Sequence, residues 1–160
     1  MERNKIMMGR IGFSILFLIL NFGALGIGTI LMDSGPTSDW YIGLNKAPWT
    51  PPGWVFGAAW TSIMLLFSFY MSTLIKLEKV KSIWFLFALQ WVLNVSWNWV
   101  FFNQHHMILG QVILILLTIT VGVFLIGFVK IMKYQSLFIV PYFLWLLVAN
   151  SLNLFTILNN

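Results

Sequence analysis

The sequence predicts an all-α membrane protein, built as one bundle of five transmembrane helices with a structured connection between the first two. Of its 160 residues, 60% are hydrophobic and only 8% are charged, which is too apolar for a soluble domain. Five stretches without charged residues each have about the length that a bilayer requires, roughly 20 residues. They are residues 11–31, 53–75, 83–102, 108–129 and 137–158. Because they use most of the chain, we expect a single membrane domain over residues 1–160.

The distribution of basic residues predicts how the bundle is oriented. Eight of the nine lie in the N-terminal tail and in the second and fourth connections, which five spans place on one side of the membrane. Only Lys46 lies on the other side. This bias follows the positive-inside rule, so we expect a cytoplasmic N-terminus and an outside C-terminus, in a bacterial inner membrane. The net charge of +5 then reflects orientation, and we expect no nucleic-acid partner.

The first span, residues 11–31, follows a basic tail as a secretory signal would. It is too long for the apolar region of a signal, and no cleavage site follows Leu31, so we expect an uncleaved helix. Ala24 and Gly28 form a pair of small residues one turn apart, which lets another helix approach closely. Packing within the bundle is the favoured interpretation, and a dimer face is the alternative.

The connection at residues 32–52 is the longest in the chain. Four of the nine tryptophans lie in it and in the start of the next helix, and tryptophan favours membrane interfaces or aromatic-walled sites. It contains Trp40, Tyr41 and Trp49, and three prolines stiffen its approach to the second span. We expect Thr50 to cap that span. The pattern predicts a rigid lid.

Polar and aromatic residues recur at helical spacing on one face of three spans. These faces carry Trp60 and Met64; Gln90, Asn94, Trp97 and Asn98; and Tyr142, Trp145, Ala149, Asn153 and Thr156. An unpaired amide is unfavourable in hydrocarbon, and the rise of 1.5 Å per residue places most of these groups in the outer half of the bilayer. They predict an aromatic pocket with few polar groups beneath the lid. Alternatively, the amides only join helices and the tryptophans form interfacial belts, which is the better account for Trp84 and Trp99.

Conventional catalytic groups are missing from the spans. The chain has no cysteine, and no Asp, Glu or Lys falls inside a span, so the sequence does not indicate thiolate or acid–base catalysis. His105 and His106 are adjacent, and adjacent side chains on a helix point apart. We expect them to lie in an interfacial loop and to bind no metal.

These residues, taken together, resemble the TspO/MBR family (tryptophan-rich sensory protein, translocator protein, or peripheral-type benzodiazepine receptor) over essentially the whole chain. The residues that carry the resemblance are Trp40, Tyr41, the segment LNKAPWTPP at 44–52, Trp60, Gln90, Asn94, Trp97, Phe101, Phe102, Pro141, Tyr142, Trp145, Ala149, Leu152 and Asn153. One departure is Ala47, which separates Lys46 from Pro48 where the family often has Lys-Pro.

The resemblance implies a five-helix bundle, often a homodimer, with a sensory or regulatory role. It implies that porphyrins, haem-like tetrapyrroles and isoquinoline-type compounds bind as ligands, with no required cofactor, in a pocket closed by the first connection. By matching position the ligand-binding residues would be Tyr41, Trp60, Asn94, Trp97, Trp145 and Ala149, to which we add Trp49 and Asn153. Trp97 stands where some relatives have Phe, and we expect it to tighten the pocket.

Two other functions are considered. The resemblance also suggests a light- and oxygen-dependent enzyme that degrades porphyrins, with Trp60 and Trp145 as catalytic redox partners. A porphyrin transporter is the other alternative, although the spans lack the broken helices and buried charges typical of transporters.

The sequence does not favour high-affinity cholesterol binding. The family's cholesterol pattern needs a basic residue beyond a Tyr on the fifth span, and nothing after Lys133 is basic. Leu66, Tyr70 and Lys76 fit the pattern only loosely on the second span.

Overall fold

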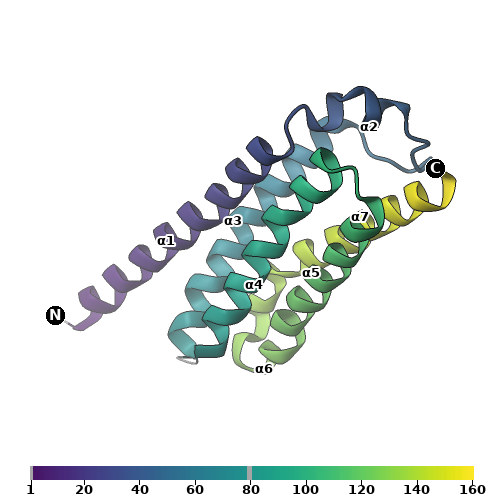
Figure 1. The fold of residues 1–160 in the computed structure, drawn as a ribbon. Coiled ribbons are helices and arrows are strands. Elements are labelled where there is room, and N and C mark those ends of the chain that lie inside the picture. Colours follow the sequence, from purple (N-terminus) through teal and green to yellow (C-terminus); the bar gives the residue numbers. More distant parts are fainter. Residues whose placement is uncertain (1, 79–80) are drawn as a thin grey trace.

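The structure, a computed structural model, describes the backbone of residues 2–78 and 81–160 and the side chains from residue 11 onward. In these ranges five helices are long and apolar enough to cross a membrane, which confirms the predicted fold class. They are α1 (Glu2–Leu31), α3 (Gly53–Leu77), α4 (Lys81–Asn98) with its continuation η2 (Trp99–Asn103), α5 (Met107–Gly127) and α7 (Val140–Asn159). Figure 1 shows them as one elongated bundle.

The helices do not pack equally against one another. α1 packs along α3 and α4, α4 packs along α5, and α5 packs along α7, whereas α3 and α7 touch at few points. The connection from α1 to α3, residues 32–52, which we call the lid, lies at the same end of the bundle as the C-terminal end of α7 (Figure 1). We call this the lid end.

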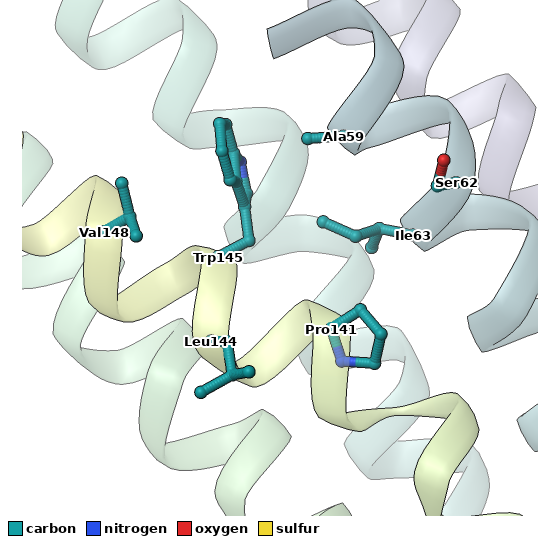
Figure 2. Close-up of a pocket in the computed structure, with 7 residues that line it drawn as sticks. All are labelled: Ala59, Ser62, Ile63, Pro141, Leu144, Trp145 and Val148. Atoms are coloured by element: carbon teal, nitrogen blue, oxygen red, sulfur yellow. The ribbon is translucent and has the colours of Figure 1, made fainter. Parts of the chain in front are cut away.

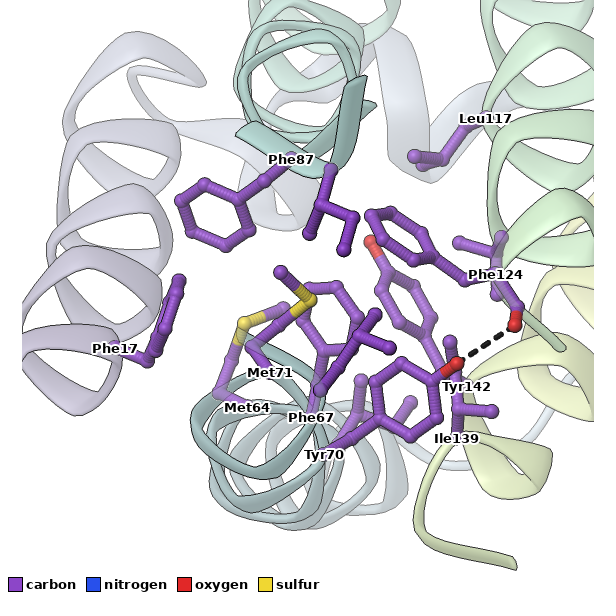
Figure 3. Close-up of a cluster of buried hydrophobic side chains, with 14 of the residues drawn as sticks. Phe17, Met64, Phe67, Tyr70, Met71, Phe87, Leu117, Phe124, Ile139 and Tyr142 are labelled. Carbon is purple, nitrogen blue, oxygen red and sulfur yellow. Dashed lines mark hydrogen bonds between the residues drawn. The ribbon is translucent and has the colours of Figure 1, made fainter. Parts of the chain in front are cut away.

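Several large aromatic side chains lie in the hydrophobic core among aliphatic residues and methionines (Figure 3). Phe67 is fully buried and contacts the rings of Tyr70, Phe124 and Tyr142. The Tyr70 hydroxyl donates to the carbonyl of Phe124 at 2.6 Å. Tyr70 therefore points into the bundle, where it is not available to a sterol on the lipid face.

The pair of small residues Ala24 and Gly28 on α1 lies inside the bundle. Ala24 is buried, and a Cβ on Gly28 would lie 2.7 Å from Asn98 Nδ2. At the same seam the Trp91 indole N–H donates to the Leu20 carbonyl at 2.9 Å. The close-packing interpretation of this pair is therefore confirmed, and the homodimer stays a prediction.

The lid has more helical structure than the sequence predicted. It contains η1 (Gly35–Thr37) and the short helix α2 (Asp39–Gly43). The expectation that Thr50 caps the second span is wrong: Pro52 occupies the N-cap position, and Thr50 instead donates its backbone N–H to Ala47 in a turn. The two prolines after Thr50 keep the chain extended there, which moves the helix start beyond its reach.

At the opposite end, the connection expected at residues 130–135 folds into α6 (Val129–Met132) and η3 (Lys133–Phe138). Pro141 lies in the first turn of α7, where its missing N–H breaks no helical hydrogen bond. Of the expected basic residues, Lys79 lies outside the described residues.

Candidate functional site

The deep tryptophans predicted for the site both lie at the seam between α3 and α7. Trp60, on α3, meets Tyr142 of α7 edge to face, with 5.9 Å between ring centroids. Trp145, on α7, meets Phe56 of α3 in the same way at 5.4 Å. Both are partly buried against the hydrophobic core. The seam is thus bridged by ring edges, with each tryptophan reaching across to the other helix.

An apolar groove runs along this seam, with a volume of about 260 Å³. Its lining residues, shown in Figure 2, are Ala59, Ser62, Ile63, Pro141, Leu144, Trp145 and Val148. The one lining hydroxyl, on Ser62, already donates to the Ala58 carbonyl at 2.8 Å. Ile63 is buried whereas Leu144 is 54% exposed, so the groove leads from the core to the lipid-facing side of two transmembrane helices.

The predicted face of α4 carries polar atoms without partners. The Gln90 side chain is buried and donates from Nε2 to the Tyr142 hydroxyl at 2.7 Å. Within the described residues, Gln90 Oε1 and Trp97 Nε1 are buried and have no hydrogen-bond partner. Asn94 is buried between them on the same helix. One acceptor and one donor therefore remain unsatisfied on this face, an arrangement that requires an explanation in a folded protein.

Gly110 of α5 makes room for the ring of Trp97. A Cβ at Gly110 would lie 3.5 Å from Trp97 Nε1 and 3.4 Å from a ring carbon of Phe101. Trp97 and Phe101 stack in parallel with centroids 5.3 Å apart. Trp97 and Phe101 therefore lie beside α5 at Gly110, where even a methyl group would be in ordinary van der Waals contact with both rings.

The end of α4 continues into a π-helix, η2, which was not predicted from the sequence. Its wider turn is closed by the bond from Gln104 N–H to the Trp99 carbonyl at 3.0 Å. Through this turn Phe101 and Phe102 both contact Tyr41 of α2, at 6.3 and 5.2 Å. Successive residues on a regular α-helix diverge by about 100°, so no helical spacing could have predicted it. Such π-turns are frequent at functional sites.

The lid contacts η2 and the turn that follows it on one side through rings. Trp40 stacks on His105 with centroids 4.1 Å apart. Tyr41 is half-buried, and burial raises the pKa of its phenol. Lys46 Nζ lies 4.7 Å above the Tyr41 ring. His105 thus has an aromatic partner, and both histidines are exposed.

On its other side the lid is tied to α7 by hydrogen bonds. The indole N–H of Trp49 donates to Ser151 Oγ at 3.2 Å, and its ring meets Phe155 edge to face. The Asn45 amide donates to the Asn159 carbonyl, and its backbone N–H donates to Asn160 Oδ1, both at 3.0 Å. The predicted site residue Trp49 therefore fastens the lid at its edge.

Asn153 points toward α5 and away from the other predicted site residues. Its amide donates to Gln111 Oε1 at 2.9 Å and to the Met107 carbonyl at 3.2 Å. Gln111 in turn donates to Asn150 Oδ1 at 2.8 Å, and Asn150 donates to Thr118 Oγ1 at 2.8 Å. We call these four side chains (Gln111, Thr118, Asn150 and Asn153) the amide ladder. Ala149, on the next face of α7, packs against the core.

Of the four residues in the amide ladder, only Asn153 was predicted as a site residue from the sequence. Gln111 and Thr118 are seven residues apart on α5, and Asn150 and Asn153 are three apart on α7. These spacings place each pair of polar residues on one face of its helix, and they can be read from the sequence. They indicate a shared face between two neighbouring spans.

Comparison with known proteins identifies relatives of the whole chain. Residues 14–158 match the sequence profile of the TspO/MBR family. The tryptophan-rich protein TspO of Chlorobaculum tepidum is 33% identical over 139 residues, covering 84% of this chain and 87% of the relative. That of Bacillus cereus is 29% identical over 142 residues, covering 88% and 92%. The human translocator protein is 27% identical over 119 residues, covering 71% and 70%.

Proposed function

Because this chain belongs to the TspO/MBR family of integral membrane proteins, we propose that it is a membrane sensor for planar tetrapyrroles of the protoporphyrin or haem type. The ligand would bind beneath the lid, between α3, α4 and α7, and isoquinoline-type compounds would occupy the same pocket. No additional cofactor is required. The observation that carries the proposal is that Trp60 and Trp145 cross the weakly packed α3–α7 seam, where Tyr142 both meets Trp60 and accepts a hydrogen bond from Gln90 of α4.

The aromatic rings supply a surface suited to a flat ligand. Trp60 and Trp145 contribute from the seam, and Trp97 contributes from α4 together with its stacked partner Phe101. A π-system gains most from offset stacking or edge contacts with other rings. A porphyrin has both a large face and an aromatic edge, so it can use either.

The unpartnered polar atoms supply orientation. Gln90 Oε1 can accept a hydrogen bond from a ligand N–H, and Trp97 Nε1 can donate one to a ligand acceptor. In a dry environment such groups favour a ligand that satisfies them, because leaving them unpaired is costly. A metal-free porphyrin presents inner N–H donors and peripheral acceptors, which matches this set, whereas haem offers the peripheral acceptors alone because iron occupies its inner nitrogens.

The groove supports entry from the lipid. Its lining is apolar, and it opens to the side of the bundle next to Trp145. Water would find almost no partners there, whereas a lipid-dissolved ligand would replace only acyl chains. The lid, bonded to α7 and stacked on η2, would meanwhile close the aqueous side.

The site is tested by titrating the purified protein with protoporphyrin in neutral detergent, in the dark, and following the porphyrin absorbance band. Trp60→Leu and Trp145→Leu should each weaken binding about tenfold, the size expected when one stacking ring is removed. Trp84→Leu is the matched control, because Trp84 is exposed near the far end of α4. Equal affinities in all three variants and the parent would reject the site.

The proposal also covers the oligomeric state of the protein and its orientation in the membrane. We propose a homodimer in a bacterial inner membrane, with the lid end facing outward. Labelling of a single cysteine introduced at position 160 in intact cells and in inverted vesicles checks the orientation. Labelling from the cytoplasmic side would contradict it.

A further inference from the structure

The lid holds one cation above the proposed pocket. The side chain of Lys46 is half-buried, and its ammonium lies 4.7 Å from the centroid of the Tyr41 ring. It also donates to the Ile42 carbonyl at 3.3 Å. An ammonium carries three N–H groups, so this resting position uses one hydrogen bond and a cation–π contact. Both contacts are weak at a partly exposed site and are easily exchanged.

A column of rings joins this ammonium to the pocket. Tyr41, below Lys46, contacts Phe101 and Phe102 of η2. Both of these contact Trp97, at 5.3 and 5.6 Å between centroids. A ligand that stacks near Trp97 would therefore have its outer edge near the lid residue that carries the positive charge.

The positive charge is local to Lys46. Among the described side chains, the other lysines lie at the opposite end of the bundle: Lys76, Lys81, Lys130 and Lys133. Asp33 and Asp39, both exposed, lie on the lid itself. The lid end thus has no broad positive field, and an anion would be drawn to this ammonium alone.

The predicted spans offer no charged partner for a carboxylate. None of the five predicted charge-free stretches contains Asp, Glu, Lys or Arg, and a bare charge within the hydrocarbon region is costly. A tetrapyrrole with carboxylate side chains must keep that edge at the water-facing end of the pocket. Resting on the function proposed above, we infer that Lys46 is a specificity-determining residue that pairs with the ligand carboxylate and selects tetrapyrrole acids over their neutral esters.

The experiment compares protoporphyrin with its dimethyl ester, which has the same macrocycle without the charges. Affinities of both are measured for the parent and for Lys46→Met, in neutral detergent and in the dark. The deciding quantity is the ratio of the two affinities within each protein, because the ester also partitions differently into detergent. Lys46→Met should shift this ratio toward the ester by about fivefold, as for one partly screened ion pair, through weaker binding of the acid alone.

Two matched variants sharpen the result. Lys46→Arg keeps the charge and should keep the parent ratio. Lys133→Met removes an exposed lysine at the far end of the bundle and should also leave it unchanged. Raising the salt concentration should weaken acid binding in the parent more than in Lys46→Met, because salt screens a charge pair.

The outcomes separate this inference from the function it rests on. An unchanged ratio in Lys46→Met, or an equal loss of both ligands with Lys46→Arg behaving the same way, overturns the role of Lys46 and leaves the pocket in place. Failure of the parent to bind either porphyrin overturns the proposed function itself. If Lys46→Met does not fold, Lys46→Gln and the salt dependence of the parent decide the question.

Discussion

The two sides of α7 are built by different chemistry. Toward α5 it is joined by the hydrogen bonds of the amide ladder. The Phe143 ring of α7 also lies close to Gly122 of α5, where an added Cβ would be 3.4 Å from a ring carbon. Toward α3, α7 meets only ring edges and the apolar groove. In a bilayer, side-chain hydrogen bonds and close packing hold helices together, because lipid is as apolar as the helix surfaces.

From this difference we predict which of the two helix contacts can separate. Separating α5 from α7 would leave several amides unpaired in hydrocarbon, whereas separating α3 from α7 exchanges ring contacts for contacts with lipid or ligand. We therefore expect α7 to stay with α5 and the pocket to open along α3. The lid, tied to α7 at Asn45 and Trp49, would follow α7.

The largest difference between the two seams is expected when a larger side chain is introduced into each of them. Gly122→Leu overfills the α5–α7 contact and should lower the free energy of unfolding by about 1–3 kcal/mol. Ala59→Leu points into the open groove and should change it by less than about 0.5 kcal/mol. Circular dichroism during titration with SDS measures both. Similar losses in the two variants would mean that the α3–α7 seam is as tightly packed as the other.

Removing the centre of the amide ladder should have the next largest effect. Gln111→Leu deletes the bonds to Asn150 and Asn153, each worth about 0.6–1.7 kcal/mol in a membrane protein, so a loss of about 2 kcal/mol is expected in the same assay. Gln104→Leu is the control, because Gln104 is exposed and its side chain bonds only to Asn103. A stability equal to that of the control would show that the amide ladder contributes nothing.

Weakening the lid should change ligand kinetics more than protein stability. Trp49→Phe keeps the ring against Phe155 but loses the bond to Ser151, a loss of about 1 kcal/mol. We expect tetrapyrrole release, measured by displacement in a stopped-flow instrument, to become about fivefold faster. Trp54→Phe changes an indole that is 75% exposed and should release at the parent rate. If the two variants release alike, the lid does not control exit.

The smallest expected effect is a pH dependence of the lid. Burial raises the pKa of the Tyr41 phenol above its ordinary value of 10.0, so an unpacked Tyr41 loses its proton before a packed one. The packing of the lid should be unaffected below pH 10 and should weaken as the pH rises from 10 toward the raised pKa. Limited proteolysis of the lid between pH 8 and 11, in the parent and in Tyr41→Phe, tests this. The variant should show no added cleavage in that window.

Several features of the site could be predicted because they follow from local patterns. Trp60 and Trp145 were placed within the bundle from helical spacing, and both lie partly buried between spans. Gln90 was placed on an inward face, and it is buried against Tyr142. Spacing on a helix specifies direction to within a fraction of a turn, so these placements needed no knowledge of the neighbours.

Other features required the neighbours. Asn153 has the spacing of a pocket residue, but its amide donates to two acceptors on α5, the Met107 carbonyl and Gln111 Oε1. The π-turn of η2 brings Phe101 and Phe102 against Tyr41 of the lid, a contact between residues far apart in the sequence. Thr50 is a residue type that favours the N-cap position, but two prolines follow it and the helix begins at Gly53, with Pro52 as its N-cap.

The five spans and most of the inward-facing residues could be read from the amino-acid sequence, because bilayer thickness and helix periodicity act on short stretches of chain. Tertiary structure decided which seam is bonded and which is open, where the lid is fastened, and which ring the Lys46 ammonium covers. These depend on pairs of residues as far apart as Asn45 and Asn160, and only the folded bundle brings such pairs together.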